Sequence, residues 1–399
     1  MEEKAMPSVF VSTNPLLFGR GTSKLVGEKC KEFNMKKVLV VFDKGVKNAG
    51  IVDKILENIH AAGVETVCYD GVLPDPPDWS CEEAGALGVK ENVDGVVAIG
   101  GGSSIDTGKA AKALLTNPPP LSQYFGRGMM LNKPGKPLIV IPTTAGTGSE
   151  CTPGGAITDT KNNVKTNVNG LGAAVNLGIV DPELTLGLPP AITASTGMDA
   201  LCHAIESFTS TLANVYCETM GKEVIRLIGK YIITAYKDGS NYEAREGMMK
   251  ASTLAGISML GPMCHFPHDI GKVLGAKWHI PHGNACVMTL PQVLEMIAPA
   301  CPDKVRFIAE ALGGQVAEDA SPEEIGKAAY QAAQSLMKAL ELPTMKDYGL
   351  KLDDLIPLVA DEVIKALSMA VKFLGAFPAP IPVTAETINE IVTRAYNEN

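Results

Sequence analysis

The sequence of 399 residues lacks the features that mark nucleic-acid-binding and membrane proteins. Its 35 lysines and arginines are outnumbered by 44 aspartates and glutamates, which gives a net charge of −9. A nucleic-acid-binding protein needs a basic face for the phosphates, so no nucleic-acid partner is expected. No stretch approaches the roughly 18 consecutive apolar residues that span a bilayer, so no membrane partner is expected either.

Paired cysteines and a secretion signal are also missing. Nine cysteines are scattered between Cys30 and Cys301 without a Cys-x-x-Cys pair, a pattern typical of free thiols in a reducing compartment. The segment from Met1 to Phe18 carries acids and a proline but no apolar core of signal-peptide length. We therefore expect a cytoplasmic protein that folds around a core without disulfides.

The first half of the chain alternates strand-like and helix-like runs. Continuous apolar strands separated by helices indicate a parallel sheet covered on both faces. The predicted strands are 38–42, 64–69, 96–99 and 138–141, and the predicted helices are 51–62 and 81–91.

Helix signals dominate beyond Pro189. Ser321 and Glu324 form a predicted capping box, and the pattern continues as helices over 328–342 and 384–396. We place the boundary in the Pro- and Gly-rich segment near Asp181 to Pro190. The predicted domains are 1–186, of α/β type, and 187–399, which is helical.

A glycine-rich segment from Gly100 to Lys109 follows the third predicted strand and opens a helix. Glycines let backbone N–H groups approach a phosphate, and the helix N-terminus adds positive charge. The pattern departs from Gly-x-Gly-x-x-Gly at Ile105 and from the P-loop, and three glycines alone also fit a tight turn. Asp43 ends the first strand, where a carboxylate can bind a ribose 2′-OH, and the polar block Pro142–Glu150 ends the fourth. Together they favour a dinucleotide, NAD.

A carboxylate and several histidines are candidates for a metal site. Asp199 and His203 lie four apart in a predicted helix, so both side chains share one face, although the pair also fits a helix-dipole Asp and a core His. His282 lies in a Pro-His-Gly turn. Such ligands suit Zn²⁺ or Fe²⁺, and the site is catalytic only if a position stays open for substrate. Spacing and composition do not choose among the four later histidines: His265, His268, His279 and His282.

The ordered set of motifs resembles the iron-containing (group III) alcohol dehydrogenase family over nearly the whole chain. The set comprises the Gly-Gly-Gly-Ser loop with Asp106, Pro-Thr-Thr-Ala-Gly-Thr, Ile157-Thr158-Asp159, Val180-Asp181-Pro182, Gly-Met-Asp-Ala-Leu-Cys-His-Ala-Ile-Glu and Pro-His-Gly-Asn-Ala. The resemblance implies a dehydroquinate synthase-like fold. Its parts are an N-terminal α/β dinucleotide-binding domain and an all-α C-terminal domain, with NAD(P) in the cleft between them, near the metal.

The resemblance also implies site residues by position. The implied metal ligands are Asp199, His203, His268 and His282. The implied cofactor-binding residues are the loop Gly101, Gly102 and Ser103 with Asp106, the threonines Thr143, Thr144 and Thr147, the ribose-contacting Lys165, the strand-end acid Asp43, and Asp75 at the adenine-side position.

Two positions depart from the family pattern. Lys272 stands where many members carry a second histidine that relays protons, and Gly154 replaces an asparagine that often faces substrate. We hypothesise that Lys272 lies at the substrate end. It would act as a catalytic proton relay, or bind a carboxylate or sulfonate group with Gly154 making room. The alternative is a lysine that extends to solvent.

The expected function is that of a metal-dependent, NAD(H)-linked alcohol dehydrogenase or aldehyde reductase. Its cofactors would be NAD(H) and Fe²⁺ or Zn²⁺, and its substrate a small alcohol or aldehyde, with anionic substrates included. A homo-oligomer, dimer or larger, is a family expectation. The alternatives are a sister polyol dehydrogenase or lyase, which His268 outside the coordination sphere would favour, and a non-catalytic nucleotide- or metal-binding protein.

Overall fold

A computed structural model describes residues 14–126, 131–374 and 376–399. Residues 1–13, which begin the first predicted domain and make up most of the segment searched for a signal peptide, lie outside the described residues. The chain folds into two compact units. The first, called the α/β unit, runs from Thr13 to Pro189 and includes Asp238–Met249; the second, called the helical unit, comprises Pro190–Lys237 and Lys250–Asn399.

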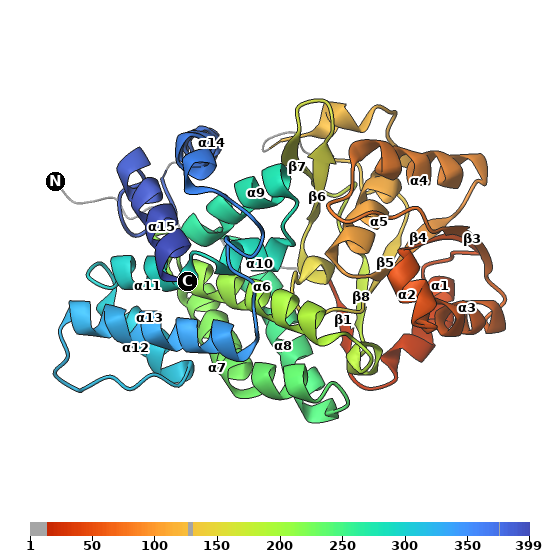
Figure 1. Cartoon of the computed structure of the whole chain (residues 1–399). Coiled ribbons are helices and arrows are strands. Elements are labelled where there is room, and N and C mark those ends of the chain that lie inside the picture. The colour runs from red at the N-terminus through yellow and green to blue at the C-terminus, as the bar shows by residue number, and fades with distance from the viewer. Residues whose placement is uncertain (1–13, 127–130, 375) are drawn as a thin grey trace. The chain divides into compact units, whose positions relative to one another are not determined.

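A six-stranded parallel sheet forms the centre of the α/β unit, with strand order β1-β8-β5-β4-β2-β3 (Figure 1). Its strands are β1 (Leu16–Phe18), β2 (Lys37–Phe42), β3 (Glu65–Tyr69), β4 (Gly95–Gly100), β5 (Leu138–Pro142) and β8 (Leu177–Val180). Every residue of β4 and β5 is buried, which explains why their sequences are continuously apolar. The four predicted strands are confirmed as β2 to β5, whereas β1 and β8 were not predicted.

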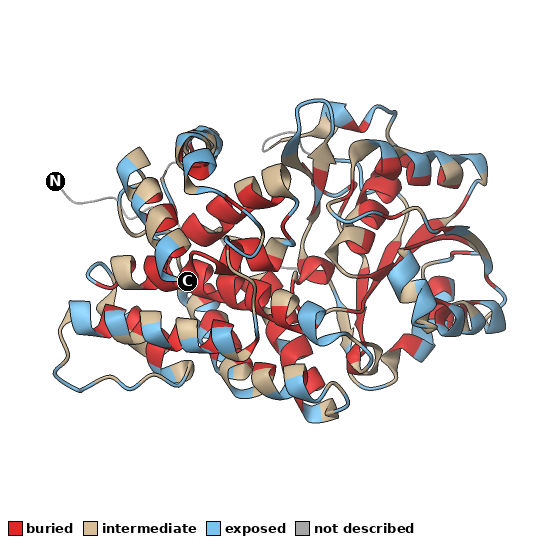
Figure 2. Ribbon diagram, viewed as in Figure 1, coloured by how far each residue is buried: buried red, intermediate tan, exposed pale blue. Residues whose placement is uncertain are grey.

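Helices cover both faces of this sheet, as the sequence predicts. On one face α1 (Val26–Glu32) and α3 (Ile51–Ala61) pack Ile55 and its neighbours against Val38 and Val40. On the other, α4 (Asp78–Lys90) and α5 (Gly102–Leu114) pack against Leu39 and Val41. Because successive residues of β2 point to opposite faces, one strand contributes to both cores. Figure 2 shows the central strands of the sheet as buried.

The strand order reverses between β2 and β4. From β2 the chain continues to β3 on one side, then returns to add β4 on the other side of β2. Ligands of open α/β sheets bind beyond the carboxyl ends of the strands at such a switch point. Asp43 follows β2 and Gly101 follows β4 at this point. Beside the sheet lies an antiparallel hairpin of β6 (Gly154–Asp159) and β7 (Val164–Asn169).

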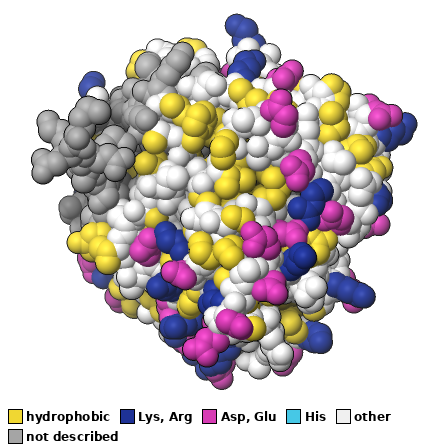
Figure 3. Space-filling model, turned by 90° about the vertical axis from the view of Figure 1, so that its left-hand side faces the viewer, with side chains coloured by type: hydrophobic (Ala, Val, Ile, Leu, Met, Phe, Trp, Pro, Cys, Tyr) yellow, Lys and Arg dark blue, Asp and Glu magenta, His cyan; other side chains and the backbone are white. Residues whose placement is uncertain are grey.

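The helical unit contains most of the helices of the second half of the chain (Figure 1). They are α6 (Pro190–Thr209), α7 (Val215–Lys237), α9 (Phe266–Trp278), α10 (His282–Val287), α11 (Leu290–Ile297), α12 (Pro302–Ala311), α13 (Pro322–Ala339), α14 (Leu352–Leu374) and α15 (Ala385–Glu398). The predicted capping box of Ser321 and Glu324 is confirmed at the start of α13, and Thr384 caps α15. Figure 3 shows one face of the molecule, on which hydrophobic, basic and acidic side chains are interspersed.

Helix α8 (Tyr242–Ser258) begins in the α/β unit and ends in the helical unit. Arg245 donates hydrogen bonds of 3.0 Å to the backbone oxygens of Gly239 and Leu188. The guanidinium of Arg20 lies 4.9 Å from the ring centroid of Tyr242. The contacts of Arg245 with Leu188 and of Tyr242 with Arg20 connect Asp238–Met249 to the α/β unit. The predicted boundary at residue 186 places this segment in the helical domain. Among the described residues, no helix has both the length and the hydrophobicity needed to cross a bilayer.

Candidate metal and nucleotide sites

Helix α6 presents three ionisable side chains on one buried face. Asp199, His203 and Glu206 are spaced four and three residues apart, so they follow one another along the same side of the helix. All three belong to a stretch in which every residue from Gly197 to Thr209 is buried. The sequence pattern predicted this shared face for Asp199 and His203 but assigned no role to Glu206.

Helices α9 and α10 bring two further histidines to α6. His268 lies in the first turn of α9, and His282 is the first residue of α10. A Cβ atom on Gly283 would lie 2.0 Å from the backbone oxygen of Ser195, so only glycine lets α10 start this close to α6. The Pro-His-Gly turn is therefore explained by the approach of the two backbones, which places His282 beside Asp199.

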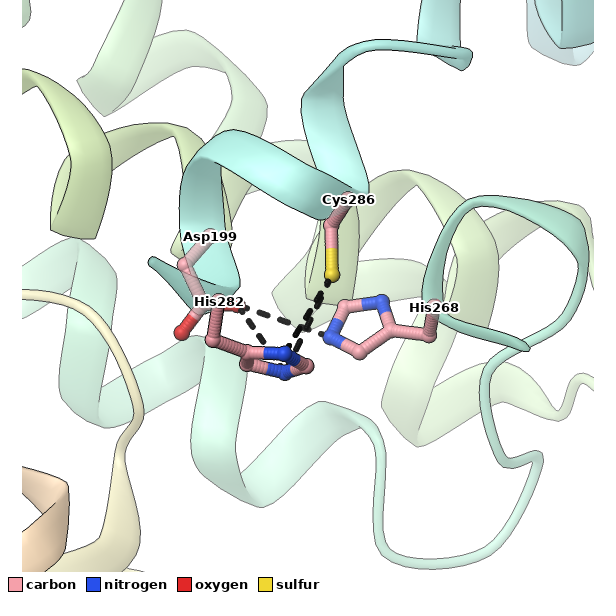
Figure 4. Close-up of side chains that lie close together, drawn as sticks. All are labelled: Asp199, His268, His282 and Cys286. Carbon is pink, nitrogen blue, oxygen red and sulfur yellow. Dashed lines mark hydrogen bonds and ion pairs between the residues drawn. The ribbon is translucent and has the colours of Figure 1, made fainter. Parts of the chain in front are cut away.

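The four implied metal ligands converge on one carboxylate oxygen. The Oδ1 atom of Asp199 lies 3.9 Å from His203 Nε2, 3.5 Å from His268 Nε2 and 3.8 Å from His282 Nε2. Figure 4 shows Asp199, His268 and His282 pointing toward one another. The side chains of Asp199, His203 and His268 are only 3%, 7% and 4% exposed, whereas His282 is 29% exposed. The cluster is thus buried except at His282, whose side chain is partly exposed.

Two buried atoms of this cluster lack the partner that buried polar atoms require. Within the described residues, Asp199 Oδ1 and His268 Nε2 make no hydrogen bond. The two atoms lie 3.5 Å from each other, within the range of an ion pair but without a hydrogen bond. A buried polar atom without a hydrogen bond costs about 1–3 kcal/mol. A divalent cation would satisfy both, and one carboxylate with three imidazoles suits Fe²⁺ or Zn²⁺. The residues present therefore fit the metal ion that the resemblance implies.

The pKa values of Asp199 and His203 suit a cation. Burial alone would raise the pKa of Asp199, but the neighbouring His203, His268 and His282 outweigh it, and the pKa of this carboxyl lies below its usual range. Burial lowers the pKa of His203 to about 4. At neutral pH Asp199 is therefore ionised and His203 is neutral, with a lone pair available to a metal ion. Burial alone would lower the pKa of His268, but the neighbouring Cys264, Cys286 and Glu206 outweigh it and hold this pKa well above its usual value, so His268 would release a proton when a metal ion binds.

Glu206 fixes the orientation of His268. Its Oε1 atom lies 2.5 Å from His268 Nδ1, and its Oε2 atom accepts the backbone N–H groups of His265 at 2.7 Å and His268 at 3.2 Å. With Nδ1 held by a carboxylate, Nε2 of His268 faces Asp199, as in the carboxylate–histidine–metal arrangement of metalloenzymes. The seven-residue spacing from Asp199 to Glu206 was the sequence signal available for this residue.

The remaining candidate histidines lie elsewhere. His265 is buried, and its Nε2 atom lies 2.9 Å from Thr209 Oγ1. His279 is exposed and ends α9 in a left-handed conformation with φ 55°. His60 is exposed and contacts Thr66. Of the four later histidines, the geometry therefore brings His268 and His282, rather than His265 and His279, into range of Asp199.

A thiol that the sequence pattern did not single out also faces the cluster. Cys286 lies one turn after His282 on α10, and its Sγ atom is 3.8 Å from both ring nitrogens of His282. Ligand atoms of Asp199, His268, His282 and Cys286 all lie within 4.8 Å of one another. A second such group comprises His203, Cys264 and His268.

The predicted phosphate loop lies at the switch point of the sheet. Gly101 is the N-cap of α5, and Gly102 is its first residue. A Cβ atom on Gly102 would lie 2.7 Å from Thr147 Cγ2, and one on Gly101 would lie 3.2 Å from Thr144 Oγ1. The loop between Gly100 and Ser103 and the block from Thr143 to Thr147 therefore pack closely. First-turn N–H groups of α5 have no helical partner and are suited to an anion.

Acidic side chains around this loop accept hydrogen bonds from other residues of the chain. Asp43 caps α2 (Lys44–Asn48) by accepting the N–H of Val46 at 3.0 Å, and its Oδ2 atom accepts a 2.9 Å bond from Ser104 Oγ. Asp106 accepts bonds from Ser149 Oγ at 2.6 Å and from the N–H of Ala156 at 2.9 Å. Asp43 is thus placed beside the loop, whereas the two carboxylate oxygens of Asp106 connect α5 to Ser149 and to β6.

Two further predicted nucleotide residues form an ion pair. Lys165 Nζ lies 2.6 Å from Asp75 Oδ1, and Asp75 adopts a left-handed conformation with φ 48°. Asp75 follows β3 and Lys165 belongs to β7. The isolated bridge between Pro77 and Thr158 joins the segment of Asp75 to β6, where Thr158 pairs with Lys165. The structure brings both residues together in the α/β unit.

Comparison with known proteins adds to this geometry. The family model for iron-containing alcohol dehydrogenase matches residues 13–182, and the model for the C-terminal part of the Fe-containing alcohol dehydrogenase family matches residues 193–396. The chain belongs to the iron-containing alcohol dehydrogenase family. The predicted family and the predicted fold class are confirmed, and the protein is an oxidoreductase of the alcohol dehydrogenase class.

Three curated relatives are each 35% identical to this family member. The choline dehydrogenase of Bacillus subtilis (strain 168) aligns with 95% of this chain and 92% of its own length. The 1,3-propanediol dehydrogenase of Citrobacter freundii aligns with 97% of this chain and 98% of its own length. The sulfoacetaldehyde reductase of Bilophila wadsworthia (strain 3_1_6) aligns with 90% of this chain and 93% of its own length.

Two solved structures share its fold over almost the whole chain. A crystal structure of 1,3-propanediol oxidoreductase has a TM-score of 0.90 and 34% identity, covering 98% of this chain and 100% of the other. A crystal structure of sulfoacetaldehyde reductase from Bifidobacterium kashiwanohense, in complex with NAD⁺, has a TM-score of 0.87 and 26% identity, covering 99% and 100%.

The structure treats Lys272 and Gly154, the two positions that depart from the family pattern, differently. Lys272 lies one turn after His268 on α9; its side chain is 42% exposed and its Nζ atom is 3.4 Å from Asp269 Oδ1. Gly154 does not make room, contrary to the hypothesis. A Cβ atom there would lie 2.1 Å from Asn169 Oδ1 and 2.7 Å from the backbone oxygen of Val168, because β7 fills that space.

Proposed function

We propose that this family member is a metal-dependent, NAD(H)-linked enzyme that interconverts a small aldehyde and the corresponding alcohol. The carrying observation is the convergence of three imidazole nitrogens on Asp199 Oδ1 within 3.5–3.9 Å in a cluster that is buried except at His282. Asp199, His203, His268 and His282 would hold a divalent ion. When bound, the ion supplies Lewis-acid polarisation of a substrate oxygen, and NAD(H) supplies or accepts the hydride.

The side chains of the protein would hold the metal ion and the cofactor and orient the metal ligands. Asp199 supplies the negative charge that favours a cation, and Glu206 keeps Nε2 of His268 aimed at it. The partly exposed side chain of His282 would give a small substrate access to the ion, which a closed structural site would deny. In the α/β unit, the first turn of α5 and Asp43 would receive the pyrophosphate and a ribose of the cofactor, respectively.

Its relatives support NAD(H) as the cofactor. A relative from Bacillus methanolicus is an NAD-dependent methanol dehydrogenase, 34% identical over 82% of this chain, and the solved sulfoacetaldehyde reductase was crystallised with NAD⁺. The carboxylate of Asp43 would accept a ribose 2′-OH and repel the 2′-phosphate of NADP(H).

The substrate proposal is a small aldehyde carrying an anionic group, such as a carboxylate or sulfonate. The relatives point in opposite directions, because choline is a cation and sulfoacetaldehyde is an anion. Lys272 favours the anion: its partly exposed ammonium lies on the same helix as His268, one turn away. Asn169 fills the space beside Gly154. Of the two positions that depart from the family pattern, only Lys272 would therefore bind the anionic group.

The test of the function is an assay of NADH oxidation on protein whose iron and zinc content has been measured. A panel of short aldehydes would include neutral, carboxylate-bearing and sulfonate-bearing members. The expected result is turnover that disappears on chelation and returns with added metal. No turnover of any aldehyde by protein carrying one ion per chain would favour a non-catalytic nucleotide- or metal-binding protein instead.

The test of the substrate class is Lys272→Met. Losing one charge-assisted contact predicts a roughly tenfold higher KM for sulfoacetaldehyde, with little change for propanal. The matched control is Lys277→Met, which removes a charge from the last turn of the same helix. Equal losses on both aldehydes would remove the anion-binding role, and would favour a role of Lys272 in proton transfer.

A further inference from the structure

Cys286 is placed like a metal ligand. The first turn of α10 carries His282, and Cys286 follows four residues later on the same side of the helix. Its side chain is fully buried and points into the cluster in Figure 4. A buried cysteine is usually a small apolar residue, but this one faces a carboxylate and two imidazoles rather than a hydrophobic core.

Distances in the group match those around a single ion. Two donors bound at about 2.0–2.3 Å to a tetrahedral metal lie roughly 3.3–3.8 Å apart. The separations are 3.5 Å from Asp199 to His268, 3.8 Å from Asp199 to His282, and 3.8 Å from His282 to the sulfur of Cys286. The sulfur therefore lies within this range of His282, and it lies within 4.8 Å of the ligand atoms of Asp199 and His268.

The neighbouring helix is adapted to this sulfur. A Cβ atom on Gly271 of α9 would lie 2.7 Å from Cys286 Sγ and 2.9 Å from the Cys286 backbone. Any larger residue at position 271 would push the thiol away or separate α9 from α10. Gly271 thus keeps the sulfur between His268, on α9, and His282, on α10.

We propose that the Cys286 thiolate is an additional ligand of the divalent ion, beside the carboxylate and imidazoles of the proposed site. The inference rests on the proposed function for the presence of that ion. On binding, the thiol loses its proton to solvent and the sulfur donates to the metal. Because thiolate is a soft ligand, Cys286 biases this site toward Zn²⁺ over Fe²⁺, despite the family name.

The decisive measurement is absorption of the full-length protein reconstituted with one equivalent of Co²⁺. A cobalt–thiolate bond gives charge-transfer absorption in the near ultraviolet that oxygen and nitrogen ligands do not give. The wild-type protein should show this band, and Cys286→Ser should lose it while still binding cobalt. The matched control is Cys264→Ser, which alters the thiol of the other group around His268 and should keep the band.

Several outcomes overturn the inference, and they can be distinguished from one another. If the wild type binds one cobalt per chain without the band, or if Cys286→Ser retains it, Cys286 is not a ligand while the proposed metal site stands. If no cobalt binds at all, the proposed function fails as well. Loss of the band in Cys264→Ser alone would assign the thiolate to Cys264.

A second measurement does not depend on a variant that folds. X-ray absorption of the zinc-loaded wild type should detect one sulfur neighbour at about 2.3 Å. In competition between equimolar Zn²⁺ and Fe²⁺ under reducing conditions, Cys286→Ser should lower the zinc-to-iron ratio bound at least about tenfold. A zinc spectrum without sulfur, or an unchanged ratio in a folded Cys286→Ser protein, would overturn the proposal.

Discussion

Glu206 Oε1 lies 2.5 Å from Nδ1 of His268, so a fully buried carboxylate determines which nitrogen of that imidazole faces Asp199. The other oxygen of Glu206 accepts the backbone N–H of His265, which begins the turn that carries His268. One side chain of α6 therefore orients both the ring and the backbone of the first turn of α9.

Replacing Glu206 should weaken metal binding without removing a ligand. Glu206→Gln keeps the shape of the side chain but can no longer hold Nδ1–H with a negative charge. The expected result is a metal affinity reduced about 10–100-fold, with activity restored by excess metal. The measurement is metal content after dialysis against a graded chelator, with activity followed at each metal concentration.

A control for that experiment is Glu218→Gln in α7. Glu218 pairs with Lys304 at 2.7 Å but lies outside the cluster, so its replacement should leave metal affinity unchanged. Equal affinity in the wild type and Glu206→Gln would contradict an orienting role for Glu206.

Removing the ion should destabilise the protein as well as inactivate it. A ligand that binds only the folded state stabilises it by about 4 kcal/mol when present at a thousand times its dissociation constant. We therefore expect a lower Tm for chelated protein and recovery on adding Zn²⁺ or Fe²⁺. Differential scanning calorimetry in metal titrations measures this shift.

The variant Asp199→Asn tests whether the metal-dependent rise in Tm comes from this cluster. It removes the charge at the atom on which three imidazoles converge, so the metal-dependent rise in Tm should be largely lost. Asp303→Asn, at an exposed position in the first turn of α12, should behave like the wild type. A full metal-dependent shift in Asp199→Asn would place the ion elsewhere.

Asp43→Asn should relax the choice between NADH and NADPH. The variant keeps a side chain that can cap α2, but it removes the charge expected to repel a 2′-phosphate. The kcat/KM ratio of NADPH to NADH should rise about tenfold, which corresponds to roughly 1.4 kcal/mol. Asp53→Asn, an exposed acid in the first turn of α3, is the control. If Asp43→Asn leaves the kcat/KM ratio of NADPH to NADH unchanged, Asp43 does not contact the ribose.

The sequence predicted the parts of the sheet whose signal is local. Strands β2, β4 and β5 are nearly continuous apolar runs because helices bury both of their faces, and those runs are visible without a structure. Strands β1 and β8 have three and four residues, too few for a periodic or continuous pattern to stand out. Their place in the sheet depends on pairing between residues far apart, such as Leu17 with Ile179.

The metal cluster shows the same division between local and long-range information. The spacing of Asp199 and His203 on one helix face was readable, but the choice of His268 over His265 was not. His265 precedes α9 with φ −135° and ψ −132°, which turns its ring toward Thr209, while His268 lies inside the helix and faces α6. Cys286 and Glu206 acquire their roles only when α6, α9 and α10 pack together.

His265 should make the stability of the metal-free protein depend on acidity. Burial lowers the pKa of its imidazole to about 4, from an ordinary value of 6.5. The unfolded chain therefore binds a proton at a pH where the folded protein does not. The stabilisation from the neutral ring is complete above about pH 6.5 and is lost as the pH falls toward 4. The full difference is about 3 kcal/mol.

Urea unfolding of metal-free wild type and His265→Gln between pH 7 and pH 4 measures this contribution. Glutamine can keep a hydrogen bond to Thr209 but does not titrate, so its free energy of unfolding should fall less steeply than that of the wild type below about pH 6.5. His60→Gln replaces an exposed imidazole that also contacts a threonine hydroxyl, and should follow the wild-type curve. Parallel curves for the wild type and His265→Gln would mean that the buried ring takes up its proton without unfolding the chain.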